Sequence, residues 1–97
     1  MDLTGKQKRY LRSIAHKLKP VFQVGKEGVN DNLIAQIDDY LEKHELLKVS
    51  ILQNSPMEKN EVAKSLSEGT DAVVAQIIGK TIVLYRESKE NKEIVLP

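Results

Sequence analysis

The amino-acid sequence predicts an α+β domain of two layers, in which helices pack against a mixed four-stranded sheet. Three segments repeat their apolar residues at helical spacing, and four shorter segments show the apolar runs or the alternation of strands. Gly79-Lys80 separates the last two apolar runs and is typical of a tight hairpin. The expected order is helix, strand, helix, strand, helix, strand, strand, with parallel neighbours where a helix connects two strands.

The first helix is expected to begin after Thr4 and to end before Pro20. Thr4 can cap the helix, and Gln7 three residues later completes a capping-box pattern. Apolar residues at helical spacing form its inward face: Leu11, Ile14, Ala15 and Leu18. The opposite face collects basic residues: Arg9, Arg12, His16 and Lys19, flanked by Lys8. Pro20 stops the helix, because a prolyl ring cannot continue it.

A loop with two glycines follows a short buried strand that is predicted at Val21–Val24. The run Gly25-Lys26-Glu27-Gly28 indicates a tight loop with unusual backbone dihedrals. Asn30 or Asp31 is placed to cap a second helix. One face of that helix is apolar: Leu33, Ile34, Ile37, Tyr40, Leu41 and His44. The other face is acidic: Asp31, Asp38 and Glu42.

The second half of the chain supplies the remaining elements. Residues 47–51 alternate apolar and polar side chains, as a half-exposed strand does. Ser55 is expected to cap a third helix, with Pro56 at its first position and Glu58 closing a capping box. Gly69 is the expected C-terminal stop of that helix. Residues 72–78 and 81–85 are the expected hairpin strands.

The bulk composition favours one domain over residues 1–97, because two cores would each be too small for a chain of this length. Residues 87–97 are polar until Ile94 and are expected to form a partly flexible tail, whose apolar end either docks on the sheet or frays. The absence of cysteine excludes disulfides and thiolate chemistry. No apolar stretch is long enough to span a bilayer and no signal-peptide core is present, so we expect a cytoplasmic protein without a membrane partner.

The charge is unevenly distributed along the chain. Residues 1–29 hold seven Lys or Arg against two Asp or Glu, a net +5, whereas residues 30–97 carry a net −4, within a total of +1. A concentration of charge is as often a solvated face as a binding face. The basic N-terminal third is therefore a candidate anion-binding surface.

The junction between the first strand and the second helix is the most informative motif. Glycines let the backbone approach a ligand with its amides turned outward, and a helix N-terminus favours an anion. Lys26 adds a full charge at the loop tip, while Glu27 opposes it. The combination suits backbone phosphates of a nucleic acid, because KH domains clamp RNA with a G-x-x-G loop. A plain turn that needs two glycines is the alternative for this loop.

Catalysis and cofactor binding find little support in the sequence. His44 lies on an apolar face, where a hydrogen-bonded core histidine is expected. His16 lies on the basic face, where RNA contact and solvation both outrank metal binding. No nucleophile–base pair or metal-ligand spacing is present, so neither an enzyme activity, a metal nor a cofactor is expected. With 4% aromatic residues, the sheet offers no stacking platform for bases.

Three sequence runs resemble the CRM domain and occur in the order expected for it: residues 11–20, 24–28 and 44–49. The resemblance is closest to the bacterial stand-alone YhbY-type form. Residues 78–86 look like the terminal hairpin of that family. The resemblance implies a KH-like RNA-binding fold, and bacterial members associate with precursors of the large ribosomal subunit. By carry-over, Gly25, Lys26 and Gly28 match the RNA-contacting loop of the family. The basic positions of the first helix match its RNA-facing surface: Lys8, Arg9, Arg12, His16 and Lys19.

Two hypotheses of different classes follow. The first is a monomeric RNA-binding factor that holds structured rRNA during maturation of the large ribosomal subunit, with no DNA target expected. The alternative is a protein-interaction adaptor on precursor particles, whose acidic second helix docks a basic ribosomal protein through Asp38 and Glu42.

Overall fold

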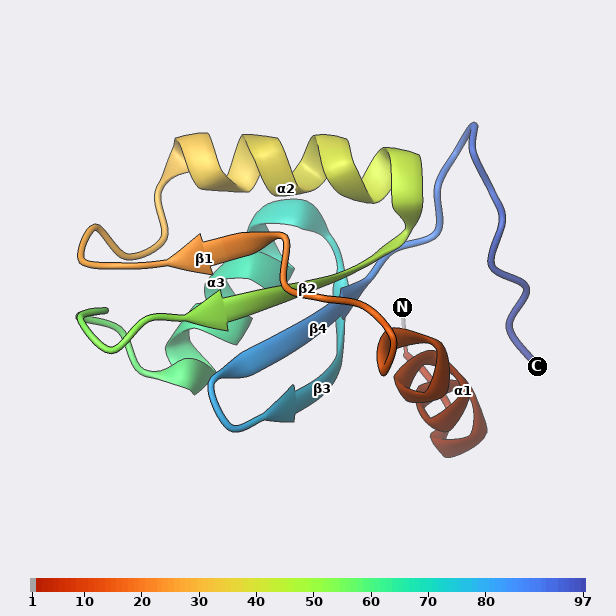
Figure 1. Ribbon diagram of the computed structural model, residues 1–97. Coiled ribbons are helices and arrows are strands. Elements are labelled where there is room, and N and C mark those ends of the chain that lie inside the picture. The colour runs from red at the N-terminus through yellow and green to blue at the C-terminus, as the bar shows by residue number, and fades with distance from the viewer. Residues whose placement is uncertain (1) are drawn as a thin grey trace.

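The computed structural model describes residues 2–97 as three helices and one four-stranded sheet (Figure 1). The elements follow one another along the chain as α1 (Gly5–Ala15), β1 (Phe22–Val24), α2 (Asp31–His44), β2 (Leu46–Ile51), α3 (Lys59–Thr70), β3 (Val73–Ile78) and β4 (Thr81–Tyr85). The α+β class and the predicted order of elements are confirmed.

The sheet is mixed, with the spatial order β1-β2-β4-β3. β1 and β2 are parallel, as the helical connection through α2 predicts, while β4 pairs antiparallel with both β2 and β3. β3 does not lie beside β2, because β4 is inserted between them. Consecutive side chains of a strand point to opposite faces, and Ile82 to Tyr85 of β4 are all fully buried. A strand that is apolar on both faces belongs at the centre of the sheet.

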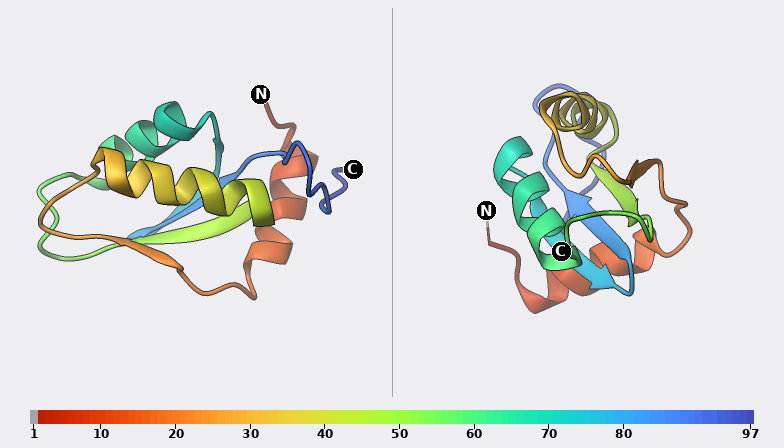
Figure 2. Two further views of the ribbon diagram at one scale, coloured as in Figure 1. Left: turned by 90° about the horizontal axis from the view of Figure 1, so that it is seen from above. Right: turned by 90° about the vertical axis from the view of Figure 1, so that its left-hand side faces the viewer.

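Each face of the sheet has its own core. α2 and α3 cover one face with the larger cluster, which includes Ile37, Leu41 and Leu66. α1 crosses part of the other face, where Leu11 and Ala15 pack into the smaller cluster. The right-hand view of Figure 2 shows α1 on the side of the sheet away from α2 and α3. α1 therefore adds a partial third layer, which the two-layer expectation did not include.

α1 begins as predicted and ends early. Thr4 caps it, and Thr4 and Gln7 exchange both hydrogen bonds of a capping box. The helix ends at Ala15, five residues before Pro20. Leu18 therefore lies outside the helix and is 40% exposed, so the prediction that it belongs to the inward face is wrong.

α3 begins and ends at other residues than predicted. Glu58 is its N-cap and shares a capping box with Glu61. Ser55 instead closes the preceding loop, where its hydroxyl accepts from the Met57 amide and donates to the Met57 carbonyl. Gly69 lies inside the helix, which continues to Thr70 and is capped by Asp71 in the left-handed conformation.

Candidate nucleic-acid interface

The loop from Gly25 to Gly28 is a single tight turn at the end of β1. The Gly28 amide donates to the Gly25 carbonyl at 3.0 Å, which leaves Lys26 and Glu27 exposed at the tip. Gly28 has a φ of +66°, and a Cβ atom there would lie 3.1 Å from the Met57 sulfur. Gly25 has no positive φ, and a Cβ there would meet only ordinary contacts. The predicted unusual dihedral therefore occurs at one glycine of the two.

The turn leads directly into the N-terminus of α2. The Asn30 side chain caps that helix by accepting from the Leu33 amide at 2.9 Å. A shallow cavity of about 260 Å³ lies between the turn and the first turns of α2, and its lining includes Gln23 and Lys26. Amides at a helix N-terminus carry a partial positive charge. Because Glu27 and Asp31 lie nearby in sequence, this cavity offers backbone donors more than net positive charge.

A second and more basic hollow lies between α1 and the sheet. It is a groove of about 450 Å³ lined by Arg9, Arg12, Ser13, His16, Lys48, Gln76 and Ile78. We call it the α1 groove. The residues that line it include three permanent cations and no carboxylate. Lys48 of β2 is held at its edge, because its ammonium donates to the Leu18 carbonyl at 3.0 Å.

The loop and α1 lie toward opposite ends of the sheet, although only a short segment separates them in the sequence (Figures 1 and 2). α1 packs against the first residue of β2, Leu46, whereas Val24 before the loop pairs with the last residue, Ile51. Those two ends of β2 are about 17 Å apart. The short β1 leads the chain away from α1 along the sheet, and that direction cannot be read from the strand's length.

The predicted binding residues therefore fall into three groups. Gly25, Lys26 and Gly28 share the loop, and Arg9, Arg12 and His16 share the α1 groove. Lys8 and Lys19 are exposed but do not line the α1 groove.

Two residues that line the α1 groove, Lys48 and Gln76, were not among the predicted binding residues. The alternation of residues 47–51 placed Lys48 on the exposed face of β2, but no local pattern brings it to α1.

His44 is not a core residue. It is exposed at the end of α2, and its ring lies over Tyr40 with 4.2 Å between ring centroids. Tyr40 also contacts Phe22 edge-on at 5.7 Å. The neighbouring Glu45 is buried instead, because the chain turns inward there with a φ of +66°.

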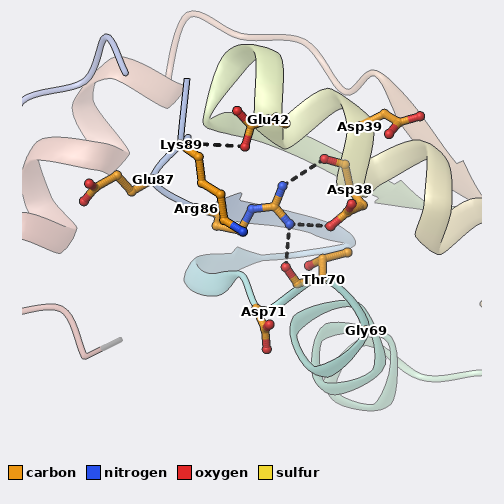
Figure 3. A pocket seen from close by; sticks show the side chains of 9 residues that line it. All are labelled: Asp38, Asp39, Glu42, Gly69, Thr70, Asp71, Arg86, Glu87 and Lys89. Carbon is orange, nitrogen blue, oxygen red and sulfur yellow. Dashed lines mark hydrogen bonds and ion pairs between the residues drawn. The ribbon is translucent and has the colours of Figure 1, made fainter. Parts of the chain in front are cut away.

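Asp38 and Glu42 of α2 line a pocket of about 510 Å³, and both have partners within the chain (Figure 3). The Arg86 guanidinium forms an ion pair with the Asp38 carboxylate and donates to the Thr70 carbonyl at 2.7 Å. Glu42 accepts from the Ser88 hydroxyl at 2.6 Å and from the Lys89 and Glu90 amides. These hydrogen bonds, that of Ser88 foremost, lower the pKa of Glu42 below its usual 4.5.

Glu45 ties the C-terminal segment to the fold. Its carboxylate accepts from the backbone amides of Ser88, Glu93 and Ile94 at 2.7 to 2.8 Å. Burial on its own would raise the pKa of Glu45, but the three amides outweigh it and lower the pKa. Ile94 and Leu96 pack against the smaller cluster beside α1. No local sequence pattern around Glu45 indicates this role, because its partners lie 43 to 49 residues further along the chain.

The described residues 2–97 include no group of three or more His, Asp or Glu side chains that could hold a metal ion. No helix within this range is both long enough and apolar enough to cross a membrane. What the arrangement provides is a basic groove and a loop rich in backbone donors, on two parts of one sheet.

Comparisons with known proteins agree on one family. The model of the CRS1 / YhbY (CRM) domain matches residues 3–86. "Probable RNA-binding protein YqeI" of Bacillus subtilis is 63% identical over 95 residues, which are 98% of this chain and 99% of that protein. An "RNA-binding protein" of Haemophilus influenzae is 38% identical over 98% of this chain and 95% of its own length. The solution structure of the hypothetical protein SAV1595 from Staphylococcus aureus has a TM-score of 0.81 and 61% identity, and the match covers 99% of this chain and 100% of that chain.

Proposed function

This chain belongs to the CRS1 / YhbY (CRM) domain family, and we propose that it is an RNA-binding protein that holds structured RNA without performing chemistry on it. The relatives from B. subtilis and H. influenzae are both named as RNA-binding, the first as a probable one, and their similarity spans almost the whole chain. The α1 groove is the observation that carries the proposal, because cations gathered without carboxylates suit a polyanion.

The loop is the proposed second phosphate contact. Its donors are the amides of the turn and of the α2 N-terminus, with Lys26 as the one cation at the tip. Because Glu27 stands beside Lys26, the larger share of the electrostatic affinity belongs to Arg9, Arg12 and Lys48 in the α1 groove. The exposed Lys8 and Lys19 extend the positive field around α1.

The proposed target is ribosomal RNA within precursors of the large subunit, bound in the cytoplasm by a monomer that forms a single domain over residues 1–97. The family resemblance supplies this target, and the distribution of charge is compatible with it. The adaptor alternative loses support, because both carboxylates on which it relies already have partners within the chain. Asp38 pairs with Arg86, and Glu42 holds residues 88–90.

Alanine substitution with a salt titration tests the proposal. Arg12→Ala is expected to weaken binding to a large-subunit rRNA fragment and to lower the slope of log affinity against log salt by about one. Lys26→Ala should have a smaller effect of the same kind. Lys64→Ala is the matched control, because Lys64 is exposed on α3 on the other side of the sheet. Unchanged affinity and slope in the Arg12→Ala and Lys26→Ala variants would contradict the proposal.

A further inference from the structure

The face of the sheet that α2 and α3 leave free connects the α1 groove to the loop. Residues paired across neighbouring strands share a face, as do residues two apart along a strand. Ser50 pairs with Gln23 on β1 and with Thr81 on β4, and Thr81 pairs with Ile78 on β3. These four residues form a row across all four strands, which we call the outer row. None of them is fully buried.

A second row lies beside the outer row and borders α1. Val83 of β4 pairs with Lys48 on one side and with Gln76 on the other. Val83 itself is covered within the smaller cluster, whereas Lys48 and Gln76 are half-buried and line the α1 groove. Successive rows are about 7 Å apart along the strands. The groove, the outer row and the loop therefore follow one another across a single surface, and Gln23 belongs to both the row and the loop cavity.

The chemistry of the outer row is that of hydrogen bonding. It presents the amide of Gln23 and the hydroxyls of Ser50 and Thr81, with Ile78 as its one apolar member. No aromatic ring lies in either row. Phe22 and Tyr40 pack on the opposite face, and Tyr85 is buried. Tyr10 is exposed on α1 but does not line the groove.

Single-stranded RNA is recognised mainly by stacking unpaired bases on aromatic side chains or on arginine guanidinium planes, and the two rows contain neither residue type. Double-helical RNA instead presents a wide, shallow minor groove with 2′-hydroxyls, bordered by two phosphate backbones. A sheet face with hydroxyl and amide groups, about 14 Å wide across four strands, suits the second form. Phosphate-binding groups lie on both sides of that face, at the α1 groove and at the loop.

We propose that this open face binds the minor groove of double-helical RNA, with the outer row contacting 2′-hydroxyls. The α1 groove holds the phosphates of one strand and the Gly25–Gly28 loop those of the other. The inference rests on the proposed function and adds the form of RNA that the site recognises. It also assigns binding roles to Gln23, Ser50 and Gln76.

The first test compares three probes of one sequence by fluorescence anisotropy at matched salt: an RNA hairpin with a stem of about 16 base pairs, one strand of that stem, and the DNA duplex. The hairpin is expected to bind about tenfold more tightly than either other probe, because only it presents paired 2′-hydroxyls. Single-stranded RNA bound as tightly as the hairpin would overturn this inference and leave the proposed function standing. A protein that binds neither RNA overturns both.

The second test addresses the surface. Ser50→Glu places a negative charge in the outer row and is expected to weaken hairpin binding about tenfold. Ser65→Glu on α3 is the matched control, with the same change in net charge on the covered side of the sheet, and should bind as the parent does. Because Ser50 is half-buried, Gln23→Glu on the exposed part of the edge strand is the second variant. Parent-like hairpin binding by Gln23→Glu, or by a folded Ser50→Glu, would overturn the assignment of the face.

Discussion

Gly25 and Gly28 occupy the two ends of one turn, but only Gly28 depends on being glycine for its backbone conformation. Its φ of +66° lies in the left-handed region, and the Met57 side chain is packed against the position where a Cβ would be. Met57 is itself held by Ser55 and accepts a hydrogen bond from the Val29 amide. The turn is therefore supported from the loop that precedes α3, a contact that the G-x-x-G motif alone does not indicate.

Alanine substitution at the two glycines should separate these requirements. Gly28→Ala is expected to lower the free energy of unfolding by about 1–2 kcal/mol, because an L-residue pays that amount in the left-handed region. Gly25→Ala should stay within about 0.5 kcal/mol of the parent, since it meets only van der Waals contacts. Urea denaturation measures both values. Equal losses of unfolding free energy for the two variants would contradict the claim that only Gly28 depends on being glycine.

Single residues are also where prediction from sequence failed most clearly. Thr4 was predicted as a cap, and Asn30 as one of two candidates, because a cap acts on amides two or three residues away. Glu45 could not be identified, because the Ser88 amide that it binds lies 43 residues further along the chain. The role of His44 was misassigned for a related reason. Helical periodicity does not show that α2 ends at His44 and that the next residue turns inward.

At the scale of elements, α2 and α3 approach each other closely at Gly69. A Cβ at Gly69 would lie 2.6 Å from the Ile34 Cδ1 atom and 3.1 Å from its Cγ2 atom. Glycine in the interior of a helix usually costs about 1 kcal/mol relative to alanine. Gly69 is therefore explained by the space that Ile34 takes, and not by the end of the helix, which was the prediction.

This packing predicts a coupling between the two residues. Gly69→Ala alone is expected to destabilise the protein by about 1 kcal/mol, because Ile34 must shift against its neighbours by more than the helix propensity returns. In an Ile34→Ala background, the same Gly69→Ala change should instead stabilise by about 0.5–1 kcal/mol. A double-mutant cycle in urea measures the coupling. Additive effects of the two substitutions would show that the helices do not meet at this point.

Most elements could be predicted because their signals are local. The periodicity of α1 and α2, the alternation in β2 and the Gly79-Lys80 turn each lie within one segment. The relation between elements was harder to predict. The basic face of α1 was identified, but its position relative to the loop depends on the path of residues 16–21 and on which strands α1 covers. The α1 groove arises only when Lys48 and Gln76 meet α1.

At the scale of the whole molecule, the charge asymmetry of the sequence corresponds to a separation in space. Cations gather on α1 and at Lys48 of β2 beside that helix, on one face of the sheet. Carboxylates of α2 lie across the sheet, where they bind Arg86 and the segment that follows β4. These carboxylates thus hold the C-terminal segment in place. That segment packs beside α1 through Ile94 and Leu96. The carboxylates contribute to the position of the basic helix without contacting it.

This arrangement predicts an acid-sensitive fold. The pKa values of Glu42 and Glu45 are both lowered in the folded chain, so the unfolded chain binds protons more readily than the folded one. Their stabilising contribution is therefore fully present above about pH 4.5 and is lost as the pH falls through the lower, folded pKa values. Urea denaturation of the parent at pH 7 and at successive pH values below 4.5 should show this loss.

The residues responsible can be separated by two variants. Glu45→Gln should lower the free energy of unfolding at pH 7 by about 1–3 kcal/mol, because an amide cannot satisfy all three backbone donors as a carboxylate does. Removal of residues 87–97 takes away the donors of Glu42 and Glu45 together, so the truncated chain should be less stable at pH 7 and lose less stability on acidification. Glu68→Gln on α3 is the control and should keep the parent's pH dependence. If the truncated chain loses as much stability below pH 4.5 as the parent, the acid sensitivity lies elsewhere, and the carboxylates do not hold the C-terminal segment against α1.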